Sequence, residues 1–159
     1  MNNSVLVFDN VLNDIPSELN SLLTEDLVPL DWYPLNYQHK YKDFCIQMLN
    51  IASNYFDLSK TVGYEFWGHN GTKPNWHYDK DEKLFEKEKK LVFPICSTVY
   101  YLEVSNLEGG KLLIEDDYII SPKTNRLVIF PPGKYHTVEN YQGKRVSLLV
   151  NPWDHEINH

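Results

Sequence analysis

Hydrophobic residues follow helical spacing in the first third of the chain. After Asp14, a candidate helix cap, they recur every three or four positions, which predicts a short amphipathic helix over residues 14–24. A clearer stripe of the same spacing predicts a second helix over residues 42–56. A short apolar strand is predicted at residues 5–8. The segment 28–39 contains two prolines and several aromatic residues, and we expect it to be irregular.

From about residue 61 onward the period shortens to that of β-strands. Glycine and proline separate short segments rich in apolar residues, a pattern typical of strands and turns. The predicted strands cover residues 62–67, 76–79, 91–103, 110–114, 126–130 and 144–150. A series of short strands that follows two helices predicts an α+β fold, with a barrel or jelly roll braced by helices on one side.

The last predicted strand has two contrasting faces. The apolar face, expected to pack beneath the helices, carries Val146, Leu148 and Val150. The opposite face, expected to look into the barrel, carries Arg145, Ser147 and Leu149. With 159 residues the chain is interpreted as one domain, residues 1–159. Within it, residues 1–60 brace the sheet and residues 61–152 form the jelly-roll core.

Composition and charge narrow the class of partner. Apolar residues make up 42% and aromatic residues 14% of the chain, as expected for a folded protein. The net charge of −7 disfavours non-specific binding to nucleic acid or to an anionic membrane, because a polyanion would be repelled. Neither a signal peptide nor a membrane-spanning segment is expected. Cys45 and Cys96 lie among apolar neighbours and are expected to be reduced core thiols, so the predicted location is cytoplasmic.

Two candidate metal ligands, His77 and Asp79, lie two positions apart. On an extended strand these side chains point to the same face, so that both can reach one metal ion. One distant histidine would complete the two-His-one-carboxylate triad of non-haem Fe(II) oxygenases, which leaves three coordination positions open. His136, which follows a Pro-Pro-Gly turn, is the candidate.

Arg145 lies nine residues after His136. A hairpin turn at residues 140–143 would place Arg145 opposite His136 on a neighbouring strand. A guanidinium group in that position can bind a carboxylate through two parallel hydrogen bonds. The pattern therefore predicts a dicarboxylic co-substrate that chelates the metal at one end and binds Arg145 at the other.

The order and spacing of these four residues resemble the Fe(II)/2-oxoglutarate-dependent dioxygenases, and in particular their prolyl 4-hydroxylase-like branch. The resemblance covers about residues 61–152 and includes Tyr100-Tyr101-Leu102 followed by Glu108-Gly109-Gly110. It implies a double-stranded β-helix core that holds Fe(II), with the three predicted metal residues as its ligands.

The same resemblance implies a binding site for 2-oxoglutarate. Arg145 would pair with the distal carboxylate, Tyr101 would assist through its hydroxyl group, and Ser147 would face the same pocket. Trp67 falls near a position that lines this pocket in relatives, where the residue is often tyrosine.

The activity implied by the resemblance is the hydroxylation of a substrate C–H bond, with release of succinate and CO₂ and with ascorbate as an auxiliary reductant. Asp79 favours hydroxylation over halogenation, because related halogenases replace this carboxylate with a small residue. Peptidyl proline is the first substrate hypothesis, and a free amino acid or another small molecule is the second.

Two other functional classes remain open at this point. A non-catalytic, cupin-like jelly roll that binds a ligand would need no arginine nine residues after the histidine. A zinc hydrolase can use a His/Asp set with one open site, but the sequence places no general base and leaves Arg145 without a purpose.

The remaining candidates lie outside the motif. The segment 80–90 is almost entirely charged and is expected to be solvated; its position directly after Asp79 also favours a loop that closes over the site. Four other histidines show no partner pattern and are expected at the surface: His39, His69, His155 and His159.

Overall fold

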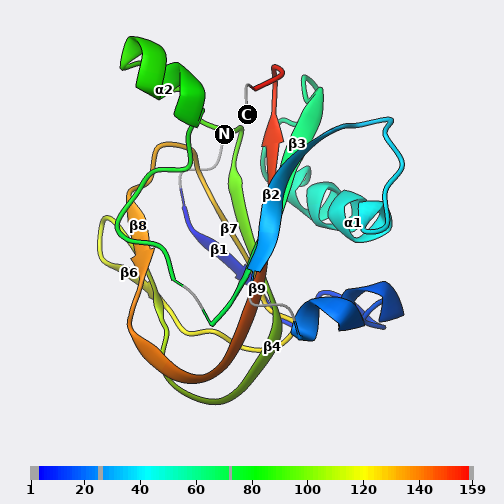
Figure 1. Cartoon of the computed structure of the whole chain (residues 1–159), viewed down its shortest axis with the longest axis vertical. Helices are drawn as coiled ribbons and strands as arrows, with labels where there is room; N and C mark the ends of the chain where they lie inside the picture. Colours follow the sequence, from blue (N-terminus) through cyan, green and yellow to red (C-terminus); the bar gives the residue numbers. More distant parts are fainter. Residues whose placement is uncertain (1–3, 25–26, 72, 158–159) are drawn as a thin grey trace.

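Two antiparallel sheets face each other in the computed structural model (Figure 1), which describes residues 4–24, 27–71 and 73–157. The larger sheet consists, in spatial order, of β1 (Leu6–Phe8), β7 (Leu127–Phe130), β4 (Ser97–Gly109), β9 (Tyr141–Trp153), β3 (Gly63–Asn70) and β2 (Leu27–Pro34). The smaller sheet consists of β6 (Tyr118–Ile120), β5 (Leu112–Ile114) and β8 (His136–Val138). This arrangement confirms the predicted α+β fold with a double-stranded β-helix core.

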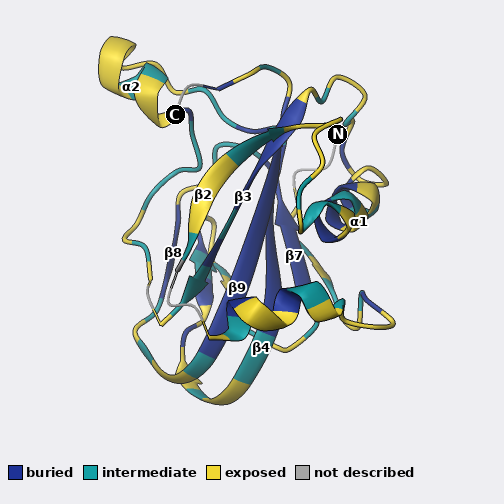
Figure 2. Cartoon of the chain, turned by 45° about the vertical axis from the view of Figure 1, so that its right-hand side comes forward, coloured by how far each residue is buried: buried dark blue, intermediate teal, exposed yellow. Residues whose placement is uncertain are grey.

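Helical segments cover the outer face of the larger sheet (Figure 2). Helix α1 (Lys42–Ala52) buries Phe44, whose ring packs edge-on against Tyr100 with 5.2 Å between ring centroids. The 3-10 helix η1 (Ser17–Leu23) buries Leu19 and Leu22 in the same core. The N-terminal helices therefore pack on one sheet, as expected.

The bounds of both helices differ from the prediction. The first helix begins at Ser17 rather than at Asp14. Its N-cap residue is Pro16 and not the predicted Asp14, and Pro16 supplies no side-chain hydrogen bond. The second ends at Ala52, and the rest of its predicted length, to Phe56, forms turns. Both predicted apolar stripes nevertheless reach the core.

The charged segment forms helix α2 (Glu82–Glu88), which projects from one end of the barrel (Figure 1) and buries none of its residues. Its first turn is capped by Asp81, whose carboxylate accepts a hydrogen bond from the Leu84 backbone N–H at 3.1 Å. Lys89 ends the helix in the left-handed conformation, with φ of 55°. Within the described residues, no helix is long and apolar enough to cross a bilayer.

Two segments were assigned wrongly from the sequence. Residues 28–39, expected to be irregular, contain most of strand β2, which lies at the edge of the larger sheet. An edge strand leaves one side of its backbone unpaired, so Pro29 and Pro34 are tolerated there. Residues 76–79 were expected to form a strand, but only His77 pairs, through an isolated bridge to His136.

Other strand bounds also shift. The predicted strand 91–103 begins only at Ser97, because Pro94 has no N–H to donate to a ladder, and it continues through polar residues to Gly109. Those polar residues pair with β9, so backbone hydrogen bonding extends the strand beyond its apolar part. Strand β6 was not predicted; it completes the smaller sheet by pairing with β5.

Strand β9 has the two faces expected of it. Val146, Leu148 and Val150 belong to the core beneath helix α1. Arg145, Ser147 and Leu149 line an interior cavity. The predicted hairpin at residues 140–143 is wrong, since β8 pairs with β5 and β9 pairs with β3 and β4. His136 and Arg145 thus lie in different sheets, as consecutive strands of a jelly roll often do.

Candidate active site

His77, Asp79 and His136 converge on one point. The backbones of the two histidines are joined by a pair of hydrogen bonds, from His77 N–H to the His136 carbonyl at 3.0 Å and from His136 N–H to the His77 carbonyl at 2.9 Å. The Oδ1 atom of Asp79 lies 3.4 Å from Nε2 of His77 and 3.5 Å from Nε2 of His136. One donor atom from each residue lies within 4.8 Å of the others. The bridge therefore brings together residues 59 positions apart in the sequence.

Backbone carbonyl groups fix the orientation of both imidazole rings. Nδ1 of His77 lies 2.7 Å from the Asn75 carbonyl oxygen, and Nδ1 of His136 lies 2.8 Å from the Lys134 carbonyl oxygen. A carbonyl oxygen only accepts, so each Nδ1 carries the proton and donates it. In the neutral rings, both Nε2 lone pairs then face Asp79, the arrangement that orients histidine ligands toward a metal.

Asp79 is held by its other oxygen. Its Oδ2 atom accepts hydrogen bonds from Ser97 Oγ at 2.7 Å and from Asn151 Nδ2 at 3.0 Å. Asn151 is itself fixed, because its Oδ1 atom accepts from the Thr98 N–H at 3.0 Å. These contacts leave Oδ1 directed at the histidines, so the carboxylate can offer a single oxygen to a cation.

The electrostatics of the three groups favour a bound cation. Burial alone would raise the pKa of Asp79, but His136, His77 and Ser97 together hold that pKa well below its ordinary value. Burial alone would lower the pKa of His136, but the Asp79 carboxylate and the Lys134 carbonyl raise it. Without a metal, the site therefore attracts a proton. A divalent metal can take that place, and two neutral imidazoles with one carboxylate are a suitable donor set for Fe(II).

Arg145 lies deep between the sheets and is 2% exposed. Its Nε atom donates to the Gly110 carbonyl at 2.9 Å, and its terminal nitrogens donate to Ser147 Oγ and Tyr101 Oη, each at 3.4 Å. No carboxylate of the described residues forms an ion pair with it. A buried guanidinium without an anion is costly, so this group is available to bind one.

The predicted residues meet around an inner cavity. The residues that line it include His77, His136, Arg145, Ser147 and Trp67. Tyr101 is not a lining residue, but its hydroxyl oxygen accepts a hydrogen bond from Arg145. Apolar walls close the rest, formed by Val99, Leu112, Val138 and Leu149. Arg145, His77 and His136 thus share one enclosed space, although they do so across facing sheets rather than along the hairpin that the sequence suggested.

An outer cavity of about 210 Å³ adjoins the inner one, with which it shares Trp67, His69, Pro74 and His77. Asp79 lies on its wall, together with Glu65, and Lys80 and Glu82 also line it. Three metal-binding candidates therefore stand between an inner space that contains Arg145 and an outer space that contains Glu65.

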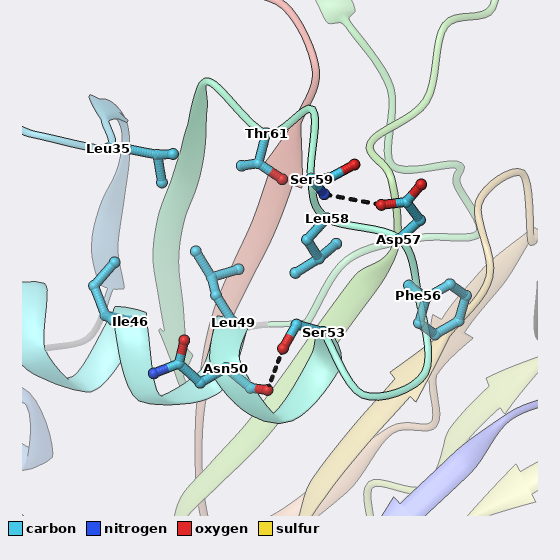
Figure 3. A pocket seen from close by; sticks show the side chains of 10 residues that line it. All are labelled: Leu35, Ile46, Leu49, Asn50, Ser53, Phe56, Asp57, Leu58, Ser59 and Thr61. Atoms are coloured by element: carbon cyan, nitrogen blue, oxygen red, sulfur yellow. Dashed lines mark hydrogen bonds between the residues drawn. The ribbon is translucent and has the colours of Figure 1, made fainter.

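A roomier cavity of about 470 Å³ lies beside helix α1 (Figure 3). Its lining is largely apolar, with Ile46, Leu49 and Phe56, and its carboxylate Asp57 accepts from the Ser59 N–H at 3.0 Å. Its lining residues include no histidine or cysteine. It therefore lacks the combination of histidine and carboxylate donors that the His77, Asp79 and His136 cluster offers to a metal.

Two of the histidines expected at the surface are half-buried instead. His39 stacks on Tyr33 and lies 2.6 Å from Tyr64 Oη. His69 lines both the inner and the outer cavity, where burial and Arg145 lower its pKa. His155 is partly exposed beside Asp154, and His159 lies outside the described residues.

The sequence analysis missed four residues of the site: Glu65, His69, Ser97 and Asn151. Alternation along strands could have indicated three of them, because Glu65 precedes Trp67 on the same face of β3. His69 follows Trp67 on the same face of β3, and Asn151 follows Arg145, Ser147 and Leu149 on the same face of β9.

The family model of the 2OG-Fe(II) oxygenase superfamily matches residues 62–153, which is more than half of the chain. The chain belongs to this superfamily. The superfamily identity implies Fe(II) and 2-oxoglutarate (2OG), and it favours an oxygenase over the cupin-like binder and the zinc hydrolase. A search of curated proteins finds no significant match.

Solved structures of prolyl hydroxylases share the fold of this 2OG-Fe(II) oxygenase. A Pseudomonas putida prolyl-4-hydroxylase is 18% identical, with a TM-score of 0.68 over 97% of this chain and 94% of that one. A Trichoplax adhaerens prolyl hydroxylase, in complex with a fragment of the hypoxia inducible factor oxygen degradation domain, is 14% identical, with a TM-score of 0.63 over 96% and 84%. The collagen prolyl hydroxylase of Paramecium Bursaria Chlorella virus-1, in complex with 2OG, is 13% identical, with a TM-score of 0.61 over 93% and 94%.

Proposed function

We propose that this 2OG-Fe(II) oxygenase holds Fe(II) with His77, Asp79 and His136, and that Arg145 binds the distal carboxylate of 2OG. The buried Arg145 carries the proposal. It shares a cavity with both histidines and has no acidic partner within the described part of the chain. A dicarboxylate of suitable length supplies the missing anion at one end and two donor oxygens to the metal at the other.

The chain itself positions and shields the reactants. Bound iron would activate O₂, the oxidant: one oxygen atom would oxidise 2OG to succinate and CO₂, and the other would convert a substrate C–H bond to C–OH. The Nδ1 hydrogen bonds keep both Nε2 atoms free to coordinate, and Ser97 and Asn151 direct one Asp79 oxygen inward. Tyr101 and Ser147 support the guanidinium, and Trp67 forms a wall of both cavities.

Peptidyl proline is the proposed substrate, and a free amino acid or other small molecule is the second candidate. The structural similarity to three prolyl hydroxylases, one of which is bound to a peptide fragment, supports peptidyl proline. The modest volume of the outer cavity, about 210 Å³, supports the second. We include ascorbate as an auxiliary reductant for the iron. The net negative charge of the chain disfavours nucleic acid as a substrate.

The division of the chain is also a proposal. We propose that residues 1–159 form one domain in which residues 1–60 brace the core of residues 61–152; the packing of Phe44 on Tyr100 supports it. The buried free thiols of Cys45 and Cys96 support a reducing, cytoplasmic location.

Succinate production tests the proposed function. Purified protein is supplied with Fe(II), ascorbate, O₂ and 2OG, and wild type is compared with His136→Ala. His155→Ala is the matched control, because this histidine lies outside both cavities. Turnover that is lost only in His136→Ala supports the proposal, and equal turnover in both variants contradicts it. If the wild-type protein forms no succinate, binding of 2OG to the Fe(II) protein is measured by calorimetry. Absence of binding refutes the proposal.

A further inference from the structure

Glu65 is a buried carboxylate that the proposed chemistry does not use. It lies in the middle of β3, between Asn151 of β9 and Trp32 of β2 in the strand register. The residue is 7% exposed, and its Oε1 atom accepts a hydrogen bond from Trp153 Nε1 at 2.7 Å. Because side chains alternate along a strand, Glu65 shares the inward face of β3 with Trp67 and His69.

The protein supplies no cation to this carboxylate. No ion pair of the described residues includes Glu65, and the ionisable groups that act on it are the carboxylates of Asp79, Asp81 and Glu82. Lys80 lines the same cavity, but its Nζ atom pairs with Glu82 at 3.0 Å. Burial, reinforced by these carboxylates, raises the pKa of Glu65 to about 8. A carboxylate is costly to bury without a partner, so its presence needs a reason.

The proposed metal does not supply that partner either. The two positive charges of Fe(II) are matched by Asp79 and by the carboxylate with which 2OG would chelate, and the distal carboxylate is matched by Arg145. Glu65 therefore has no cationic partner when the proposed co-substrate and metal are both bound, and its raised pKa of about 8 keeps it largely protonated near pH 7 until a cation arrives.

Glu65 faces the space that lies beyond the metal residues. It lines the outer cavity together with His77 and Asp79, and Trp67 and Tyr78 add aromatic surface to the same walls. A carboxylate next to aromatic rings is the combination that recognises an ammonium or guanidinium group. The volume of about 210 Å³ suits a group of side-chain size.

We propose that the outer cavity binds a cationic nitrogen group of the substrate, an amine or a guanidinium, through Glu65, and that this contact holds the neighbouring C–H bond at the metal site. This inference rests on the proposed function and adds the substrate class to it. The cation belongs either to a free basic amino acid or to a basic residue beside the hydroxylated position of a peptide. In both cases Glu65 is a specificity-determining residue.

Binding of paired probes tests the inference. N-acetyl-L-lysine amide and N-acetyl-L-norleucine amide differ in the terminal ammonium group, and their affinities are measured by calorimetry under argon, with Fe(II) and 2OG and again without metal. Wild type should prefer the lysine probe by roughly 10- to 100-fold, the usual range for a buried charge-assisted hydrogen bond. Glu65→Gln keeps an acceptor for Trp153 but removes the charge, so it should abolish the preference.

Glu86→Gln is the matched control. It removes the same charge from an exposed carboxylate of α2 that does not line the cavity, and it leaves the Lys80–Glu82 pair in place, so the preference should stay intact. Equal affinity of wild type for the two probes, or a preference that persists in Glu65→Gln, overturns the inference. If Glu65→Gln does not fold, proton release from the wild-type protein is measured instead. Binding of the lysine probe at pH 7, followed by calorimetry in buffers of different ionisation enthalpy, should release close to one proton. No proton release contradicts the role of Glu65.

Further binding measurements distinguish a small-molecule substrate from a peptide, and they distinguish failure of this inference from failure of the proposed function. Tighter binding of free L-lysine than of the amide indicates a small-molecule substrate, and the reverse indicates a peptide. Loss of the lysine preference with 2OG binding retained refutes the inference alone. Retention of the preference in a protein that fails to bind 2OG refutes the proposed function alone.

Discussion

Replacement of Arg145 by methionine separates its contribution to 2OG binding from its contribution to the fold. The guanidinium is 2% exposed and donates to one backbone carbonyl and to two hydroxyl groups. Methionine has a similar length, no charge and a flexible side chain that fills irregular space. Arg145→Met therefore removes the proposed anion-binding group and largely preserves the packing around it.

The structure predicts a large effect of this substitution on the affinity for 2OG and a small effect on the free energy of unfolding. Removal of one partner of a buried, hydrogen-bonded charge pair costs about 2–5 kcal/mol of binding, which weakens the affinity for 2OG by roughly 30-fold to several thousand-fold. The fold loses the hydrogen bond to Gly110, a cost of about 1–3 kcal/mol, but it no longer buries an unpaired charge. We expect the free energy of unfolding without ligands to change by less than about 2 kcal/mol.

Calorimetry on the Fe(II) protein under argon measures the first quantity, and urea unfolding measures the second. Ser147→Ala is the control, because it removes a long, 3.4 Å contact to the arginine and leaves the charge in place. It should weaken 2OG binding by about tenfold at most. An Arg145→Met protein that binds 2OG within threefold of wild type would refute the assigned role.

Three other perturbations test separate parts of the structure. Asn151→Ala removes a donor to Asp79 Oδ2 and should lower Fe(II) affinity by roughly 10- to 100-fold in competition with a chelator; unchanged affinity would show that Ser97 alone positions the carboxylate. The pKa of Glu65 is raised to about 8 in the folded protein from an ordinary value of 4.5, so its neutral form contributes stability that is lost as the pH rises through 8. Urea unfolding of chelator-treated protein between pH 6 and pH 9 should show this loss, and Glu65→Gln should flatten it; parallel curves would contradict the raised pKa. Phe44→Ala should cost about 3–5 kcal/mol of unfolding free energy, because the ring is fully buried between helix and sheet, and a cost below about 1 kcal/mol would mean that α1 does not brace the core.

The convergence of the three proposed metal ligands could be predicted because its signal is a spacing of residue types along the chain. His77 and Asp79 stand two positions apart, and the distance to His136 and on to Arg145 follows a pattern of residue types that does not depend on the bounds of any strand. The predicted strand at residues 76–79 reduces to a single bridge, yet the two side chains still face one point. The proximity of these side chains was thus predicted more accurately than the element that carries two of them.

The missed features depend on contacts between distant segments. Strand β2 exists because it pairs with β3, a contact that Pro29 and Pro34 conceal in the local pattern. The placement of Arg145 near His136 was expected from a hairpin, but it arises from two sheets that face each other. Alternation along β3 places Glu65 on the same face as Trp67, but it does not tell a buried carboxylate from a solvated one; the burial and the cavity in the structure do.

Helix α2 buries none of its residues, whereas β9 is hydrogen-bonded on both sides along the centre of the larger sheet. The arginine proposed to bind 2OG and the asparagine that holds Asp79 both lie on β9. Residues 82–88 can therefore be exchanged for a segment of different length or charge with little effect on the free energy of folding. The scaffold is in this respect suited to retargeting: a grafted rim would alter which molecules are admitted, and the catalytic centre beneath it would remain in place.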